Sequence, residues 1–154
     1  LNHKVILTPY ELSNPEAVQR IQVMWAAMGA DVIEMTADHH DAVLAQTSHL
    51  PHLLAYTLVD VLAGSGDGRE VFDYAAGGFR DLSRIAASDP DMWRDIFLSN
   101  KTALLRLIDT FQEALAETAA LIENDQAEQL MDQLARAKSA RDYFASIQPP
   151  SKHQ

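Results

Sequence analysis

Two histidines three residues apart begin an apolar stretch and are the first candidates for chemistry. His49 and His52 lie in "SHLPHLLAYTL", residues 48–58, with Pro51 between them. At this spacing both rings can lie on one side of a helix, or on two sides of a kink caused by Pro51, which lacks a backbone N–H. The pair therefore indicates either partly buried structural histidines or the wall of a small-molecule site.

A second stretch with chemical potential is "GGFRDLSRIAASDPDMW", residues 77–93. Its arginines, Arg80 and Arg84, are four residues apart and share one helical turn. The planar guanidinium fork binds a carboxylate through two parallel hydrogen bonds, so either arginine could hold an anionic ligand in this acidic chain. The alternative is a surface salt bridge to Asp81 or Asp95.

The triplet His39, His40 and Asp41 resembles, locally, the His-Asp pair of metal-dependent phosphohydrolases. Those enzymes need further ligands on other helices, and here only His49 and His52 could supply them. A histidine-rich helix start also arises as a solvated capping turn, so we predict no metal site.

Composition restricts the class of protein. The chain has 154 residues, 47% of them hydrophobic, which suits one domain, or one domain with part of another. It has no cysteine, and its 12 basic and 22 acidic residues give a formal charge of −10. This charge argues against nucleic-acid binding. No apolar run reaches membrane-spanning length and no signal-peptide core is visible, so we expect a cytoplasmic protein without a membrane partner.

The first 36 residues have the pattern of a strand–helix–strand unit. Val5–Leu7 and Ala30–Met35 are β-type runs, Asn14 and Pro15 mark a helix start, and Gly29 is a left-handed stop. The helix between the strands should turn these side chains inward: Val18, Ile21, Met24, Trp25 and Met28. One such unit cannot cover both faces of a parallel sheet, so we expect the chain to begin partway through an α/β domain.

Helical patterning dominates the rest of the chain. The predicted helices cover 37–62 with a break near Pro51, then 69–76, 79–87, 90–98, 101–123 and 126–147. The loop at residues 64–68, "GSGDG", follows a helix and not a strand, so it predicts a linker and not a phosphate-binding loop. Apolar faces on the two longest helices suggest a bundle and a subunit interface: Leu104, Leu105, Ile108, Phe111, Leu115 and Ile122, then Leu130, Leu134, Ala137, Tyr143 and Phe144.

Four stretches together resemble the carboxy-terminal part of the prephenate dehydrogenase family: "VILTP", "WAAMGADVIEM", "HHDAVLAQTSHLPHLLAYTL" and "GGFRDLSRIAASDPDMWRDIFLSN". The resemblance implies a mainly α fold, a helical bundle like the carboxy-terminal domain of 6-phosphogluconate dehydrogenase, preceded by a short βαβ fragment of a Rossmann domain. Residues 1–36 would end the dinucleotide-binding domain. Residues 37–148 would form the all-α dimerisation and prephenate-binding domain, and residues 149–154 a tail or linker.

The family's reaction oxidatively decarboxylates prephenate to 4-hydroxyphenylpyruvate with NAD or NADP. The glycine-rich fingerprint and the catalytic histidine of the family are expected upstream of residue 1, so we predict no catalytic residue in this chain and no turnover by it alone. The resemblance further implies a homodimer, and it raises L-tyrosine as a feedback inhibitor.

The resemblance also assigns substrate-binding residues. Arg84 matches the arginine that binds a substrate carboxylate. His49 and His52 match a histidine pair lining the pocket, turned toward the ligand by the kink at Pro51. The remaining matches near the pocket are Ser48, Gly77, Asp81 and Trp93, and Gly77 and Trp93 are candidates to reach it from the partner subunit. Two alternatives stay open: a helical dimerisation module without a ligand site, and a metal-dependent phosphohydrolase-like helical domain.

Overall fold

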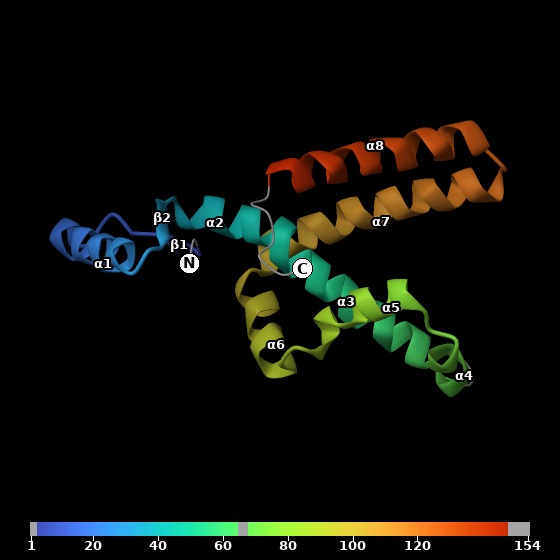
Figure 1. The fold of residues 1–154 in the computed structure, drawn as a ribbon, viewed down its shortest axis with the longest axis horizontal. Coiled ribbons are helices and arrows are strands. Elements are labelled where there is room, and N and C mark those ends of the chain that lie inside the picture. Colours follow the sequence, from blue (N-terminus) through green and yellow to red (C-terminus); the bar gives the residue numbers. More distant parts are fainter. Residues whose placement is uncertain (1–2, 65–67, 148–154) are drawn as a thin grey trace. The chain divides into compact units, whose positions relative to one another are not determined.

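The computed structural model describes residues 3–64 and 68–147, so the tail at 149–154 and the centre of the 64–68 linker lie outside the described residues. Helices dominate, after a short strand–helix–strand unit (Figure 1), which confirms the predicted fold class. The chain divides into two compact units, Leu1–Ile108 and Asp109–Gln154. The elements are β1 (Lys4–Leu7), α1 (Pro15–Ala27), β2 (Asp31–Glu34), α2 (Ala37–Leu44), a π-helical segment (Ala45–His49), α3 (Leu50–Gly64), α4 (Gly68–Asp73), α5 (Gly77–Ser83), a 3-10 turn (Ile85–Ala87), α6 (Pro90–Ser99), α7 (Lys101–Glu123) and α8 (Ala127–Ile147).

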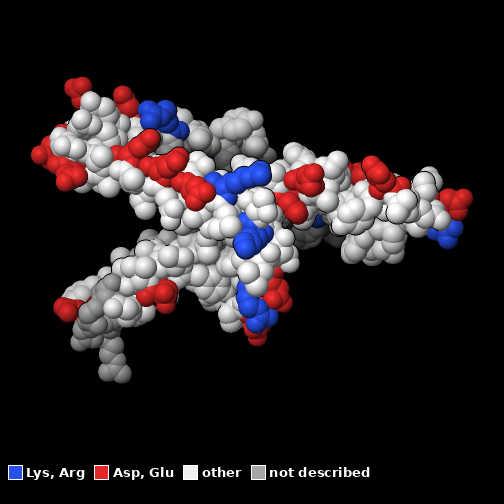
Figure 2. Space-filling view, turned by 180° about the vertical axis from the view of Figure 1, so that it is seen from behind, with Lys and Arg blue, Asp and Glu red and all other residues white. Residues whose placement is uncertain are grey.

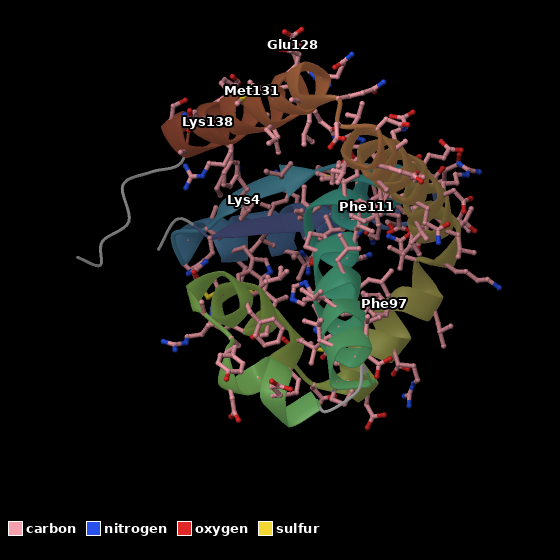
Figure 3. The ribbon with its side chains drawn as sticks, turned by 90° about the vertical axis from the view of Figure 1, so that its right-hand side faces the viewer. Lys4, Phe97, Phe111, Glu128, Met131 and Lys138 are labelled. Carbon is pink, nitrogen blue, oxygen red and sulfur yellow. The ribbon has the colours of Figure 1, made fainter. Side chains whose placement is uncertain are left out.

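The strand–helix–strand unit forms as the sequence predicts. β1 and β2 pair in parallel, with Lys4 opposite Asp31. An ion pair of 2.8 Å joins these two side chains, and Lys4 is labelled in Figure 3. The Asn14 side chain caps α1 by accepting from the backbone N–H groups of residues 16 and 17. Gly29 follows the end of α1 and has a φ of 83°, a left-handed conformation that glycine adopts without a Cβ clash.

The prediction that α1 turns its apolar face inward is wrong for most of that face. Ile21, Met24, Trp25 and Met28 are all exposed, and Val18 is half-buried. The physical reason is the size of the sheet, because α1 lies against β2 and two short strands cannot cover a 13-residue helix.

The irregularity near Pro51 lies before the proline and is a π-helical segment instead of a break. The N–H of Leu50 donates to the carbonyl of Ala45, five residues back, as in a π-helix. Pro51 then occupies the first turn of α3, where its missing N–H is tolerated, and α3 continues to Gly64. His49 ends the π-helical segment and His52 lies in the first turn of α3, so the return from π-helix to α-helix falls between the two histidines.

The segments after α3 fold back against it. α4, α5 and the 3-10 turn all contact α3, and α5 lies beside it in Figure 1. The Tyr56 hydroxyl donates to the Ser88 carbonyl across 2.6 Å, which ties α3 to the end of the 3-10 turn. Asp89 then caps α6 by accepting from the Met92 N–H, and Pro90 begins the helix. These contacts hold the "GGFRDLSRIAASDPDMW" stretch against the helix that carries His52.

The second unit consists of the remainder of α7 and all of α8, which run side by side as an antiparallel hairpin (Figure 1). Gln133 donates to the Thr118 hydroxyl across 2.8 Å between the two helices. Most of the predicted apolar faces nevertheless stay exposed, since Leu115 and Leu134 each retain 58% of their accessible surface. Two helices alone cannot bury these faces.

The described surface agrees with the acidic composition. On the face shown in Figure 2, Asp and Glu side chains outnumber Lys and Arg, and no broad basic area is visible among the described residues. Glu128 and Lys138 project from α8 (Figure 3). Within residues 3–64 and 68–147, no helix has the length and apolarity needed to span a bilayer.

Candidate functional site

His49 and Asn100 form a buried polar pair at the centre of the first unit. His49 is 9% exposed and Asn100 is 7% exposed. The Asn100 amide nitrogen, Nδ2, lies 3.1 Å from His49 Nδ1 and 2.8 Å from the carbonyl oxygen of Asp41. Asn100 stands between α6 and α7, and its own carbonyl accepts from the Leu104 N–H. One side chain therefore joins the end of α2, the π-helical segment and the start of α7.

Trp93 packs against both histidines. Its ring stacks on His52 with centroids 3.7 Å apart and an interplanar angle of 19°, and it meets His49 edge-on at 6.3 Å. Phe97 also packs against Trp93, with ring centroids 5.4 Å apart. The indole Nε1–H is fully buried and has no hydrogen-bond partner among the described residues. An orphaned buried donor is costly, so this N–H is an unsatisfied polar group within the cluster of His49, His52 and Trp93.

The environment of His49 favours the neutral ring. Burial, followed by the nearby His40, lowers the pKa of His49 below its ordinary value of 6.5; Asp41 opposes this shift and His52 adds to it. A neutral imidazole can enter a ligand contact without placing another fixed charge in the site.

Replacing His49 by glutamine should remove a pH-dependent part of the stability. As pH falls through 6.5, the unfolded chain takes up the proton first, so the free energy of unfolding decreases between that value and the lower pKa of folded His49. Urea unfolding measures the free energy of unfolding of the parent chain and of His49→Gln. We expect the difference between these two free energies to change across this pH window. The matched control is His39→Gln, at an exposed histidine of α2; an equal change there would contradict the assignment to His49.

The structure brings together only some of the predicted site residues. His49, His52 and Trp93 are in ring contact, and Ser48 joins them because its carbonyl oxygen lies 2.8 Å from His52 Nδ1. The expectation that Trp93 reaches a partner's pocket stays a prediction, although its ring already stacks on His52 of its own chain.

Gly77 and Asp81 lie on α5, and Arg84 lies at its end. None of them has a described contact to the ring cluster, which consists of His49, His52 and Trp93. All three are exposed. Arg84 is the C-cap residue of α5 and directly precedes the 3-10 turn that packs on α3. Its guanidinium has no ion pair or hydrogen bond with the described residues. Asp95, one of its expected salt-bridge partners, pairs with Arg94 at 2.9 Å instead. Arg84 is therefore an exposed cation without a side-chain partner among the described residues.

Two contributors to this region were not identified as site residues from the sequence. Asn100 was not among the predicted site residues, because its partner His49 is 51 positions away. Tyr56 was not singled out, although it lies one helical turn after His52 and its hydroxyl holds the Ser88 carbonyl. The spacing of Tyr56 from His52 was a usable signal, whereas nothing local in the sequence pointed to the partner of Asn100.

The triplet of His39, His40 and Asp41 is engaged in local contacts. His40 Nδ1 lies 3.0 Å from an Asp41 carboxylate oxygen, and the His39 N–H donates to the Thr36 hydroxyl that caps α2. Among the described residues, no three His, Cys, Asp or Glu side chains are grouped as ligands for one metal ion.

Two mostly apolar hollows lie in the first unit. One, of about 330 Å³, borders Trp93 and is lined by Tyr56, Pro90, Trp93, Arg94, Phe97 and Leu98. The other, of about 380 Å³, lies between the end of β1 and the start of α1 and contains no predicted site residue. The first hollow extends the apolar surroundings of the ring cluster, while the second is separate from it in sequence.

Comparison with known proteins gives a consistent result. Residues 36–136 match the family model described as prephenate dehydrogenase, dimerization domain. The chain is 38% identical over 142 residues to the cyclohexadienyl dehydrogenase of Zymomonas mobilis, covering 91% of this chain and 48% of that protein. It is 36% identical over 138 residues to the prephenate dehydrogenase of Bacillus subtilis, covering 89% and 37%. The chain thus spans half or less of the length of these relatives.

Solved structures match over nearly the whole chain. Prephenate dehydrogenase from A. aeolicus in complex with hydroxyphenyl propionate and NAD+ has a TM-score of 0.85 and 38% identity, covering 92% of this chain and 50% of that one. Arogenate dehydrogenase from Synechocystis has a TM-score of 0.79 and 28% identity, covering 92% and 52%.

Proposed function

This chain belongs to the prephenate dehydrogenase family through its dimerization domain, and from that premise we propose that it is the carboxy-terminal part of an enzyme that oxidatively decarboxylates prephenate. The observation that carries the proposal is the cluster of His49, His52 and Trp93, with a buried indole N–H that lacks a partner among the described residues. A helical module that only dimerised would not need an unpaired donor beside two histidines.

The proposed reaction requires orientation more than acid–base chemistry from these residues. NAD or NADP, held by the rest of the enzyme, would supply the acceptor for a hydride from the ring carbon that bears the hydroxyl. The bond to the ring carboxylate would break to release carbon dioxide, and its electrons would complete the aromatic ring of 4-hydroxyphenylpyruvate. Because aromatisation drives the reaction, the protein's main tasks are to position the substrate and to exclude water.

The described residues fit the recognition of a dicarboxylate. Arg84, which has no described ion pair, would hold one carboxylate through its two parallel N–H groups. His49 would donate to the side-chain carbonyl or carboxylate as a neutral ring, His52 would line the same pocket, and Trp93 would add its unpaired N–H and an aromatic surface. Ser48, Gly77 and Asp81 complete the proposed substrate site.

The described residues do not fit the pyrophosphate of NAD or NADP. The β1–α1 connection, residues 8–14, contains no glycine. Its helix N-terminus is already occupied, because Asn14 accepts from the N–H groups of residues 16 and 17. We therefore propose that the cofactor is held mainly by a separate dinucleotide-binding domain of the enzyme, to which residues 1–36 contribute a β–α–β end.

The proposal includes a homodimer built by residues 37–148, L-tyrosine as a feedback inhibitor, a place in tyrosine biosynthesis and a cytoplasmic location. The exposed apolar faces of α7 and α8 support the homodimer, since such faces are rarely left in water. The two subunits would then contribute the same apolar surface to an interface with two-fold symmetry.

Calorimetric titration of prephenate into the 154-residue chain tests the proposal, with Arg84→Ala as the matched variant. Saturable binding that the variant loses would support a substrate site in this chain anchored by Arg84. If the chain does not bind, the titration is repeated with the full-length protein that contains it and NAD+. Failure of that protein to bind or oxidise prephenate would contradict the proposed function.

A further inference from the structure

The hydrogen bonds of Asn100 settle the direction of its contact with His49. The carbonyl oxygen of Asp41 only accepts, so the Asn100 group that lies 2.8 Å from it is the NH2 group. This nitrogen has two hydrogens to donate and accepts none. The atom 3.1 Å away on its other side, His49 Nδ1, must therefore be an acceptor.

The tautomer of His49 follows from that direction. In a neutral imidazole one ring nitrogen carries the hydrogen and the other accepts. With Nδ1 accepting from Asn100, the hydrogen of His49 lies on Nε2. A proton on Nδ1 would place two donors against each other, and relieving the clash by rotating the amide would break the bond to Asp41. His49 Nε2 has no partner among the described residues, so its hydrogen is available to a ligand.

His52 is held in the opposite state. Its Nδ1 lies 2.8 Å from the Ser48 carbonyl, which only accepts, so Nδ1 carries the hydrogen and Nε2 of the neutral ring has a lone pair. The two histidines beside Trp93 thus differ in the role of Nε2, with a donor on His49 and an acceptor on His52. A backbone carbonyl imposes the state of His52, whereas a replaceable side chain imposes that of His49.

We propose that Asn100 is a positioning residue that keeps His49 as an Nε2–H donor toward an oxygen atom of the bound substrate. This rests on the proposed function, because it requires His49 to line the substrate site. The ligand group would be a carbonyl or carboxylate oxygen, since both accept hydrogen bonds. Asparagine suits this role because its NH2 supplies the two donors that Asp41 and His49 require, whereas aspartate supplies none.

The tautomer can be measured directly in the full-length protein that contains this chain, labelled with 15N in histidine and without ligand. Nitrogen chemical shifts and long-range N–H couplings identify which ring nitrogen is protonated, and loss of the signals in His49→Asn assigns them. We expect the hydrogen of neutral His49 on Nε2 and that of neutral His52 on Nδ1. A hydrogen on Nδ1 of His49 would overturn the proposal without any variant having to fold.

The near-isosteric variant Asn100→Asp then tests the cause. The carboxylate should draw a proton onto His49 Nδ1 and raise the pKa of the ring, while His52 stays unchanged as an internal control because its partner is a backbone carbonyl. A His49 hydrogen that stays on Nε2 in the variant would overturn the role of Asn100.

Affinity for hydroxyphenyl propionate, measured with NAD+ present, tests the link to the ligand. In Asn100→Asp, affinity should fall about tenfold as pH rises through the raised pKa of His49, because the neutral ring then loses its Nε2–H. The parent protein should show no such fall over this range. A variant with the shifted tautomer and unaltered affinity would overturn the ligand role. Absence of binding by both proteins, with the expected tautomers, would assign the failure to the proposed function.

Discussion

Replacing Arg84 by lysine in the full-length enzyme is expected to raise KM for prephenate about 10-fold to 100-fold. Hydrogen bonds to charged groups contribute about 1.5–3 kcal/mol each, and lysine cannot form the two parallel bonds that a guanidinium makes with a carboxylate. Arg84→Ala should raise KM further, because it removes the charge as well. Initial rates measured over a range of prephenate concentrations would determine KM and kcat separately.

Arg80→Lys is the matched control for this substitution. Arg80 lies one helical turn before Arg84 on α5, is also exposed, and likewise has no described side-chain ion pair. Only Arg84, however, directly precedes the 3-10 turn that packs against α3, the helix that carries His52. An unchanged KM in Arg84→Lys, or an equal rise in Arg80→Lys, would contradict the role of Arg84 as the carboxylate anchor.

The double substitution Leu115→Lys/Ile122→Lys is expected to convert the proposed homodimer into monomers and to abolish most of the proposed activity. These residues are seven positions apart on α7, share one face and are 58% and 61% exposed in the single chain. Burying each against a second subunit would contribute about 1.5–3 kcal/mol, and a lysine there would instead bury an unpaired charge. Sedimentation velocity over a range of concentrations would measure the loss of dimer.

Glu113→Lys/Glu117→Lys is the control for the dimer prediction. Glu113 and Glu117 are exposed and lie two residues before and after Leu115, so each is about 200° around the helix from it. This pair also introduces two lysines on α7 but leaves the apolar face intact. A dimer that persists in Leu115→Lys/Ile122→Lys, with the helical content of the parent, would contradict this face as the interface.

Local sequence signals predicted most helix and strand positions. The caps and prolines at Asn14–Pro15 and Asp89–Pro90 begin helices where expected, and Gly29 takes the left-handed conformation that ends a helix. These features depend on backbone groups within a few residues of each other, so the order of residues determines them. The same locality explains why the histidine pair and the arginine stretch could be recognised as candidates.

Contacts between elements required the tertiary structure. The stacking of Trp93 on His52 joins residues 41 positions apart, and the Asn100–His49 bond joins residues 51 positions apart. No periodic pattern encodes such a pairing, because it depends on which helix faces meet after the chain folds.

The correction on α1 has the same origin. An amphipathic pattern shows which side chains favour burial, but not whether enough surface exists to bury them, and β1 and β2 are too small to cover that face. For this chain the sequence alone determined the elements, the family resemblance and the candidate residues. Only the folded chain decided that His49, His52, Trp93 and Asn100 form one cluster, because hydrogen bonds and ring contacts require atoms to meet in space.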